Sequence, residues 1–181
     1  MGRDKAFLPW AGGTLLSHVL QTAGAVAGEV RIVGDTAKFC SFGQVVEDLY
    51  RERGPLGGIH AALLQSATEL NLMLAVDLPF LEPKFLDYLL AQSRESDAVV
   101  CVPRAGGRWQ PLCAVYRQAF ANTAEQALRE GKNKVDALFT QVKTRVIEED
   151  ELARAGFSGE MFRNLNTPED LKQARSETRS P

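Results

Sequence analysis

The stretch NLMLAVDLPFL, residues 71–81, joins a short apolar run to a carboxylate and a proline. The run 71–76 is short and, after Asn71, continuously apolar, which is typical of a strand buried on both faces of a sheet. Asp77 follows the run directly, and Pro79 prevents the strand from continuing. The stretch therefore predicts a central strand that ends in an acidic side chain.

Apolar residues elsewhere alternate between helix-like and strand-like spacing. The alternation predicts an α/β domain with a mostly parallel sheet flanked by helices. Ligands of such sheets bind outside the carboxyl ends of the strands, which is where Asp77 is expected. Strands are expected at 29–34, 44–47, 71–76, 97–102, 111–116 and 144–148, and helices at 15–23, 57–64, 84–93, 119–129 and 168–175.

The bulk properties exclude several classes of protein. The 181 residues suit one domain, expected over 1–175 and followed by a polar tail at 176–181. A net charge of −2 offers no broad basic surface to a nucleic acid, so an anionic ligand needs a local site. No apolar stretch approaches the roughly 20 residues of a membrane span. Three widely spaced cysteines are typical of thiols in a reducing compartment, so a cytoplasmic protein is expected.

Asp77 has two interpretations. A carboxylate at the carboxyl end of a central strand suits a hard cation such as Mg²⁺, which usually also contacts substrate phosphates. Alternatively, Asp77 caps a turn before a helix that starts near Pro83. This stretch alone leaves both open.

Two stretches before it have the same ambiguity. The sequence GPLGGI places Gly54, Gly57 and Gly58 around the start of a helix. Glycine lets the backbone approach a ligand closely, and a helix start offers N–H groups to an anion, although a plain loop-to-helix connection explains them too. Asp48 ends the strand before this loop. Its carboxylate either accepts hydrogen bonds from the amide or amino edge of a ligand or belongs to a turn.

NLNTPEDL, residues 164–171, contains a strong helix start at Thr167 and Pro168. That cap does not require Asn164 and Asn166. Their carboxamides are candidates for coordinating a metal or a polar ligand.

Three basic or titratable residues complete the set of candidates. Lys5, in the tripeptide DKA, either neutralises a nucleotide phosphate or is an exposed basic residue. His18 and His60 fall inside expected helices, where helix-surface or core roles are expected rather than ligation.

Five motifs in order resemble one family. MGRDKAFLPWAGGTLLSHVL, VVEDLYRERGPLGGI, LMLAVDLPFL, WQPLCAVY and NLNTPEDL are similar to the motifs of the molybdenum cofactor guanylyltransferases, the MobA-like nucleotidyltransferases. The resemblance runs over nearly the whole chain. It implies a Rossmann-like nucleotidyltransferase domain that joins GMP from GTP to the phosphate of molybdopterin, using Mg²⁺ and releasing pyrophosphate. It also implies a GTP-binding accessory protein and molybdoenzyme chaperones as partners.

The resemblance also implies roles for the candidate residues. Lys5 would contact the GTP phosphates and, with Asp77, carry the catalysis. Asp77 would bind Mg²⁺ and phosphate, and Asp48 would help to read the guanine. The nucleotide pocket would be shaped by Gly54, Gly57 and Gly58. The metal and cofactor side would be lined by Asn164 and Asn166.

The chain departs from the family pattern at two places. Gly34 stands where the family often has an asparagine near the base, so a base contact there would fall to the backbone or to Asp35. The family normally begins with a strand and a loop of the form LAGGxSxRMGxDK, of which only MGRDK is present. The first strand and phosphate loop are therefore expected to be lacking, which would leave unpaired backbone groups on the neighbouring strands.

Two alternatives stay open. One is a molybdopterin cytidylyltransferase of the same superfamily. The other is a non-catalytic nucleotide- or cofactor-binding relative, since the glycine-rich loop is absent. A sugar-nucleotide pyrophosphorylase is disfavoured because such enzymes usually carry more chain.

Overall fold

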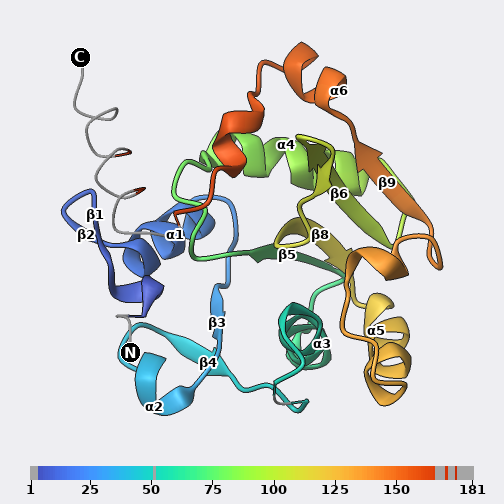
Figure 1. Ribbon diagram of the computed structural model, residues 1–181, viewed down its shortest axis with the longest axis horizontal. Coiled ribbons are helices and arrows are strands. Elements are labelled where there is room, and N and C mark those ends of the chain that lie inside the picture. Colours follow the sequence, from blue (N-terminus) through green and yellow to red (C-terminus); the bar gives the residue numbers. More distant parts are fainter. Residues whose placement is uncertain (1–3, 51, 166–169, 171–173, 175–181) are drawn as a thin grey trace.

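The computed structural model describes residues 4–50, 52–165, 170 and 174 (Figure 1). Its largest sheet has the strand order β5-β8-β6-β7, and β9 pairs with β6. The strands are β5 (Leu70–Leu74), β6 (Val100–Ala105), β7 (Arg108–Trp109), β8 (Cys113–Arg117) and β9 (Thr144–Ile147). The α/β fold class expected from the sequence is confirmed.

The large sheet is mixed rather than mostly parallel. Strand β8 is antiparallel to both β5 and β6, and β9 is parallel to β6, so β5, β6 and β9 run the same way. The direction of β8 corrects the sequence-based expectation. Only the short β7 hairpin, which turns at Gly106 and Gly107 with φ of +57° and +68°, separates β6 from β8. A connection without a crossover helix returns the chain antiparallel.

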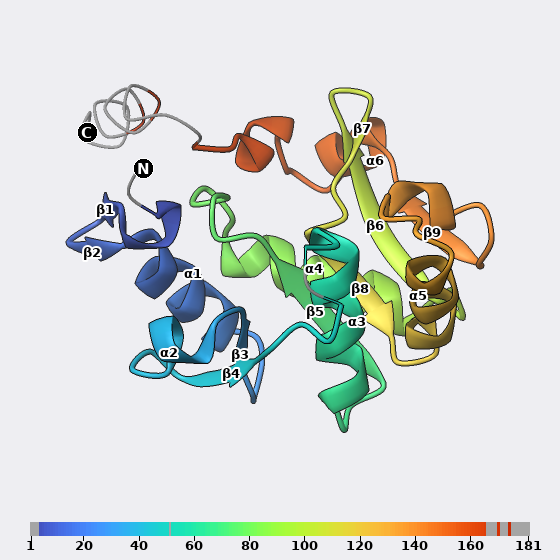
Figure 2. The ribbon, with the colours of Figure 1, turned by 60° about the horizontal axis from the view of Figure 1, so that its bottom comes forward.

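Helices cover both faces of this sheet (Figure 1). On one face α3 (Pro55–Gln65) and α5 (Phe120–Arg129) lie side by side, as Figure 2 shows. The other face is covered by α4 (Pro83–Arg94) and α6 (Glu149–Arg154). Helices α3, α4 and α5 each present several buried apolar residues to the sheet, which is why helical spacing located them in the sequence.

Alternate residues of the central strands enter opposite cores. Val100 and Val102 of β6 pack with α3 and α5, whereas Cys101 between them packs with α4. Tyr116 and Val115 of β8 divide in the same way. The period of two places buried side chains on both faces, so most residues of β6 and β8 are apolar, with Arg104 and Arg117 near their carboxyl ends.

The N-terminal part forms two small sheets. A hairpin of β1 (Pro9–Trp10) and β2 (Gly13–Thr14) follows the single turn η1 (Lys5–Phe7) and leads into α1 (Leu15–Gly24). Strands β3 (Arg31–Val33) and β4 (Gln44–Val46) pair in parallel, with α2 (Thr36–Phe39) between them. The remaining single turns are η2 (Asp136–Leu138) and η3 (Gly159–Phe162).

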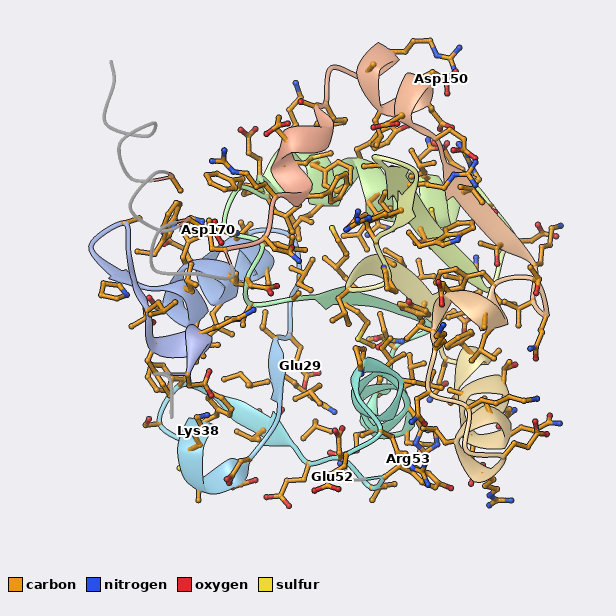
Figure 3. All side chains as sticks on the ribbon, viewed as in Figure 1. Glu29, Lys38, Glu52, Arg53, Asp150 and Asp170 are labelled. Atoms are coloured by element: carbon orange, nitrogen blue, oxygen red, sulfur yellow. The ribbon has the colours of Figure 1, made fainter. Side chains whose placement is uncertain are left out.

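A groove separates the small β3–β4 sheet from the large one. In the described residues β3 pairs only with β4 and β5 pairs only with β8, so one edge of each strand has no strand partner. Both strands, with α1, line a cavity of about 510 Å³. Glu29, labelled beside β3 in Figure 3, also lines it. Every side chain of β5 is therefore half-buried, which corrects the expectation of a strand buried on both faces.

The expected strands and helices up to residue 148 are present within a few residues of their predicted bounds. The helix expected at 168–175 and the tail at 176–181 lie outside the described residues, apart from residues 170 and 174. None of the helices in the part of the chain that the structure describes is long and apolar enough to cross a membrane.

Candidate functional site

A lysine–aspartate pair lies beyond the carboxyl end of β5. After Leu74 the chain leaves the sheet in a turn that carries Asp77, whose side chain is 20% exposed. The Nζ atom of Lys5 lies 3.5 Å from Oδ2 of Asp77, although 72 residues separate them. This separation is longer than the roughly 2.8 Å of a strong charged hydrogen bond. The pair places an ammonium group, which suits a phosphate, beside a carboxylate, which suits a cation.

Lys5 is held in place by its own segment. Asp4 caps η1 by accepting a hydrogen bond from the N–H of Ala6 at 2.9 Å. The Asp4 carboxylate also forms an ion pair with Lys38, which Figure 3 labels on α2. The Lys38 ammonium lies 5.1 Å from the centre of the Phe39 ring. These contacts attach the segment that carries Lys5 to the small sheet.

The 164–165 segment runs beside Asp77. The N–H of Leu165 donates to the carbonyl oxygen of Asp77 at 3.1 Å. Asn164, the preceding residue, is exposed and is thereby placed near the same turn. Asn166, the other predicted carboxamide, lies outside the described residues.

Asp48 lies against the first turn of α3. Its Oδ1 atom is buried and has no hydrogen-bond partner in the described structure, and burial raises the pKa of its carboxyl group. A Cβ atom on Gly57 would lie 3.7 Å from Oδ2, and one on Gly58 would lie 3.5 Å from Oδ1. The carboxylate thus faces the helix where there are no side chains. A buried acceptor without a partner is rare, and ligand N–H groups would satisfy it.

The three glycines also have packing reasons. A Cβ on Gly57 would lie 2.9 Å from the carbonyl oxygen of Tyr50, and one on Gly58 would lie 3.1 Å from Cγ1 of Val33. Gly54 has φ of +62°, a conformation that L-residues disfavour, and Pro55 follows it at the start of α3. Glycine therefore lets the helix start approach the strands closely, which forms the wall beside Asp48.

The departure at Gly34 has a packing explanation. A Cβ there would lie 2.9 Å from the ring of Phe39, so a side chain at this position would require that ring to move. The neighbouring Asp35 is exposed, and its carboxylate accepts a hydrogen bond from the N–H of Ala37 at 2.9 Å as the cap of α2. Asp35 is thus engaged in capping, which leaves Asp48 as the better candidate for contacting a base.

The donors around Asp77 suit one type of metal site. The described residues hold no group of three or more histidine, cysteine, aspartate or glutamate side chains that could hold a metal ion. A single carboxylate does not make a closed protein site of the zinc type. It fits Mg²⁺, which keeps several waters and is commonly held by one or two carboxylates together with substrate phosphates.

A cavity of about 560 Å³ opens next to this turn. Phe80, three residues after Asp77, lines it, and the Arg163 guanidinium lies 4.6 Å from the centre of the Phe80 ring. Sequence reasoning missed this cavity because most of its wall comes from 156–163, which carries no periodic pattern or motif. The lining residues are Phe80, Glu82, Phe85, Gly156, Phe157, Ser158, Glu160, Met161 and Arg163.

The candidate residues thus form two groups. Lys5, Asp77 and Asn164 gather beyond the end of β5, whereas Asp48 and the glycines lie where the small sheet meets α3. The two groups are carried by different elements of the fold. A ligand that uses both must be long enough to reach from the small sheet to the large one.

Comparison with known proteins gives one consistent family. Residues 1–146 match the profile of the MobA-like NTP transferase domain. The "Probable molybdenum cofactor guanylyltransferase" of Pelotomaculum thermopropionicum is 37% identical over 177 residues, which cover 97% of this chain and 85% of that protein. The "Molybdenum cofactor guanylyltransferase" of Desulfosudis oleivorans is 30% identical, with 97% and 87% covered.

Solved structures show the same fold. "Molybdopterin-guanine dinucleotide biosynthesis protein A" from Archaeoglobus fulgidus matches this chain with a TM-score of 0.84 at 24% identity. The match covers 98% of this chain and 91% of the Archaeoglobus chain. A 2-C-methyl-D-erythritol 4-phosphate cytidylyltransferase from Thermus thermophilus has a TM-score of 0.69 at 20% identity, with 97% and 94% covered.

Proposed function

This chain belongs to the MobA-like NTP transferase family, and we propose that it transfers GMP from GTP to the phosphate of molybdopterin, releasing pyrophosphate. The chain is a nucleotidyltransferase, and its curated relatives are named for molybdenum cofactor guanylyltransfer. One observation carries the proposal beyond the family. Lys5 and Asp77, distant in sequence, lie 3.5 Å apart beyond the carboxyl end of β5, where α/β sheets bind their ligands.

The proposed reaction requires positioning more than proton transfer. A phosphate oxygen of molybdopterin attacks the α-phosphorus of GTP, and the bond from that phosphorus to the bridging oxygen of the β-phosphate breaks. The attacking oxygen is already ionised, so no strong base is needed. The Lys5 ammonium reduces the repulsion between the two anions and stabilises the charge that develops on pyrophosphate. Holding both phosphates in line supplies much of the remaining acceleration.

Asp77 and Asn164 are the residues that would hold Mg²⁺, through a carboxylate and a carboxamide oxygen. When bound, the cation supplies charge neutralisation at the transferring and leaving phosphates. Asp77 also orients the Lys5 side chain through the 3.5 Å contact between them.

Asp48 supports guanine as the base. Guanine presents an N–H and an amino group side by side on one edge, so it can donate to both oxygens of a carboxylate. Cytosine presents one amino group next to an acceptor, and the acceptor would face the second oxygen unfavourably. The buried, unpartnered Oδ1 of Asp48 therefore favours GTP over CTP.

The 560 Å³ cavity next to Asp77 is the proposed site for the acceptor. Its volume lies within the range of small-molecule sites. The Phe80 and Phe157 rings suit the flat pterin system of the acceptor, and the Arg163 guanidinium suits its phosphate. The phosphate would then lie on the Asp77 side, since Phe80 and Arg163 adjoin that turn.

The test is pyrophosphate release by the purified chain with GTP, molybdopterin and Mg²⁺. We expect Asp77→Asn to lower kcat by about 10²- to 10³-fold, the usual effect of removing a group that stabilises transition-state charge. The control Asp87→Asn, at an exposed position on α4, should be unchanged. No release by the parent chain with GTP, or equal use of CTP, would contradict the proposal.

A second measurement tests the base contact. Asp48→Asn replaces one acceptor oxygen by a donor, so the KM for GTP should rise about 10- to 100-fold, corresponding to the loss of a charged hydrogen bond. The selectivity for GTP over CTP should fall with it. An unchanged KM would place the base elsewhere.

A further inference from the structure

His18 makes a hydrogen bond that the proposed chemistry has not used. The residue lies on α1 and is half-buried. Its Nε2 atom lies 2.9 Å from the carbonyl oxygen of Pro79, two residues after Asp77. A carbonyl oxygen can only accept, so Nε2 carries the hydrogen and donates it. The bond joins α1 to the turn that carries Asp77, across 61 positions of sequence.

Aromatic packing supports this bond. The Trp10 ring lies edge-on to the His18 ring at 6.3 Å and perpendicular to the Phe80 ring at 5.5 Å. Trp10 is buried in a cluster that also includes Val76, the residue before Asp77. The turn from 76 to 80 is therefore held against α1 on both sides of Asp77.

The same helix also holds the segment that carries Lys5. The N–H of Leu15, the first residue of α1, donates to the carbonyl oxygen of Leu8 at 2.9 Å. Leu8 in turn donates its N–H to the carbonyl oxygen of Lys5 at 3.0 Å. Helix α1 thus anchors both members of the Lys5–Asp77 pair, one through Leu15 and the other through His18.

We infer that His18 is a positioning residue, whose hydrogen bond to Pro79 fixes the Asp77 turn at the distance from Lys5 that phosphate binding requires. The expected loss of rate rests on the proposed function, whereas the expected change in the Lys5–Asp77 distance does not. Displacing a charged group by about 1 Å in an active site can reduce the rate about 10²-fold. The Asp77 turn is the part that moves when the bond is removed, because α1 is a regular helix with a capping box at Thr14 and Ser17.

The experiment compares two substitutions at His18. His18→Leu removes the donor while retaining an apolar side chain, and His18→Gln retains an N–H donor. We expect His18→Leu to lower kcat for pyrophosphate release by about 10- to 100-fold and to raise the Mg²⁺ concentration needed for half-maximal rate, with the KM for GTP unchanged. His18→Gln should recover most of the rate. The control Gln21→Leu, at an exposed position three residues along α1, should match the parent.

A crystal structure of His18→Leu gives a readout that does not depend on activity. A Lys5–Asp77 separation that increases beyond 3.5 Å supports the inference, and an unchanged separation overturns it. A kcat for His18→Leu equal to the parent value, or an equal loss in His18→Gln, also overturns it. If the parent chain releases no pyrophosphate, the proposed function fails. The Lys5–Asp77 separation in the His18→Leu crystal structure, compared with that of the parent, still decides the role of His18.

Discussion

Replacing Gly57 by alanine should destabilise the protein, although alanine is the better helix former. In an exposed helix position the change would add about 1 kcal/mol to the free energy of unfolding. At Gly57, however, the new Cβ would lie 2.9 Å from the carbonyl oxygen of Tyr50. That oxygen belongs to the backbone, so relief requires a shift of the segment that follows Asp48 or of α3 itself.

The sign of the effect depends on which contribution is larger. Overpacking in a closely packed site costs about 1–3 kcal/mol, and a backbone obstacle belongs in the upper half of that range. After the gain in helix propensity, the free energy of unfolding should fall by about 1–2 kcal/mol. In a chain of this length that corresponds to a melting temperature lower by about 3–6 °C. Affinity for GTP should also fall, since the shift moves Asp48.

The matched control is Gly24→Ala. Gly24 ends α1, and a Cβ there would meet no atom within 4 Å. The same substitution should therefore raise the free energy of unfolding by about 0.5–1 kcal/mol. Urea unfolding followed by circular dichroism measures both variants against the parent. If Gly57→Ala proved as stable as the parent, the close approach of α3 to Tyr50 would not be a constraint, and the packing explanation for this glycine would be wrong.

Two further predictions concern buried titratable groups. His60 is 1% exposed, and burial lowers its pKa from the ordinary 6.5, so the unfolded chain takes up a proton that the native protein does not. The free energy of unfolding should therefore decrease as pH falls below 6.5, by at most about 1.4 kcal/mol per pH unit. In His60→Phe this dependence on pH should be weaker. Urea unfolding at several pH values measures it, and equal slopes in the parent and the variant would contradict the reasoning. Among the thiols, Cys40 is exposed, whereas burial raises the pKa of Cys101 to about 12 and Cys113 is fully buried. Ellman's reagent should react quickly with one thiol in the native protein and with three in urea, and a second fast thiol in the native protein would show that these strands open.

The sequence predicted regular elements well because their burial is periodic. The apolar stripes of α4 and α5 and the apolar strands β6 and β8 all face a core, so their spacing reports their structure. Helix α6 escaped prediction because five of its six residues, Glu149–Arg154, are charged or small and only Leu152 is buried. The direction of β8 also escaped, since it depends on a hairpin of seven residues, 106–112, and not on the composition of the strand.

The candidate site was predictable where each residue adjoins the end of a strand. Asp77 follows an apolar run directly, and Asp48 follows Val45 and Val46 after one residue, so their place at a sheet edge could be inferred from local sequence. The meeting of Lys5 with Asp77 and of His18 with Pro79 depends on packing across more than 60 residues. No local pattern encodes such distances. The same reason hid the cavity wall at 156–163, which forms only when η3 folds against α4.

The division of the candidate site between two sheets gives α3 a particular role. The helix begins beside Asp48, at the small sheet, and its buried residues Leu56 and Ile59 enter the core beneath the large sheet. At its far end the Gln65 carbonyl accepts a hydrogen bond from the Arg31 guanidinium of β3. In the described residues α3 thus contacts both sheets, whereas no strand pairing joins them across the groove. If the proposed roles of Asp48 and Asp77 hold, the distance between the bound base and the phosphates depends on how α3 packs. Close packing at its glycine-rich first turn would therefore affect the geometry of the whole proposed nucleotide site, and not only the wall beside Asp48.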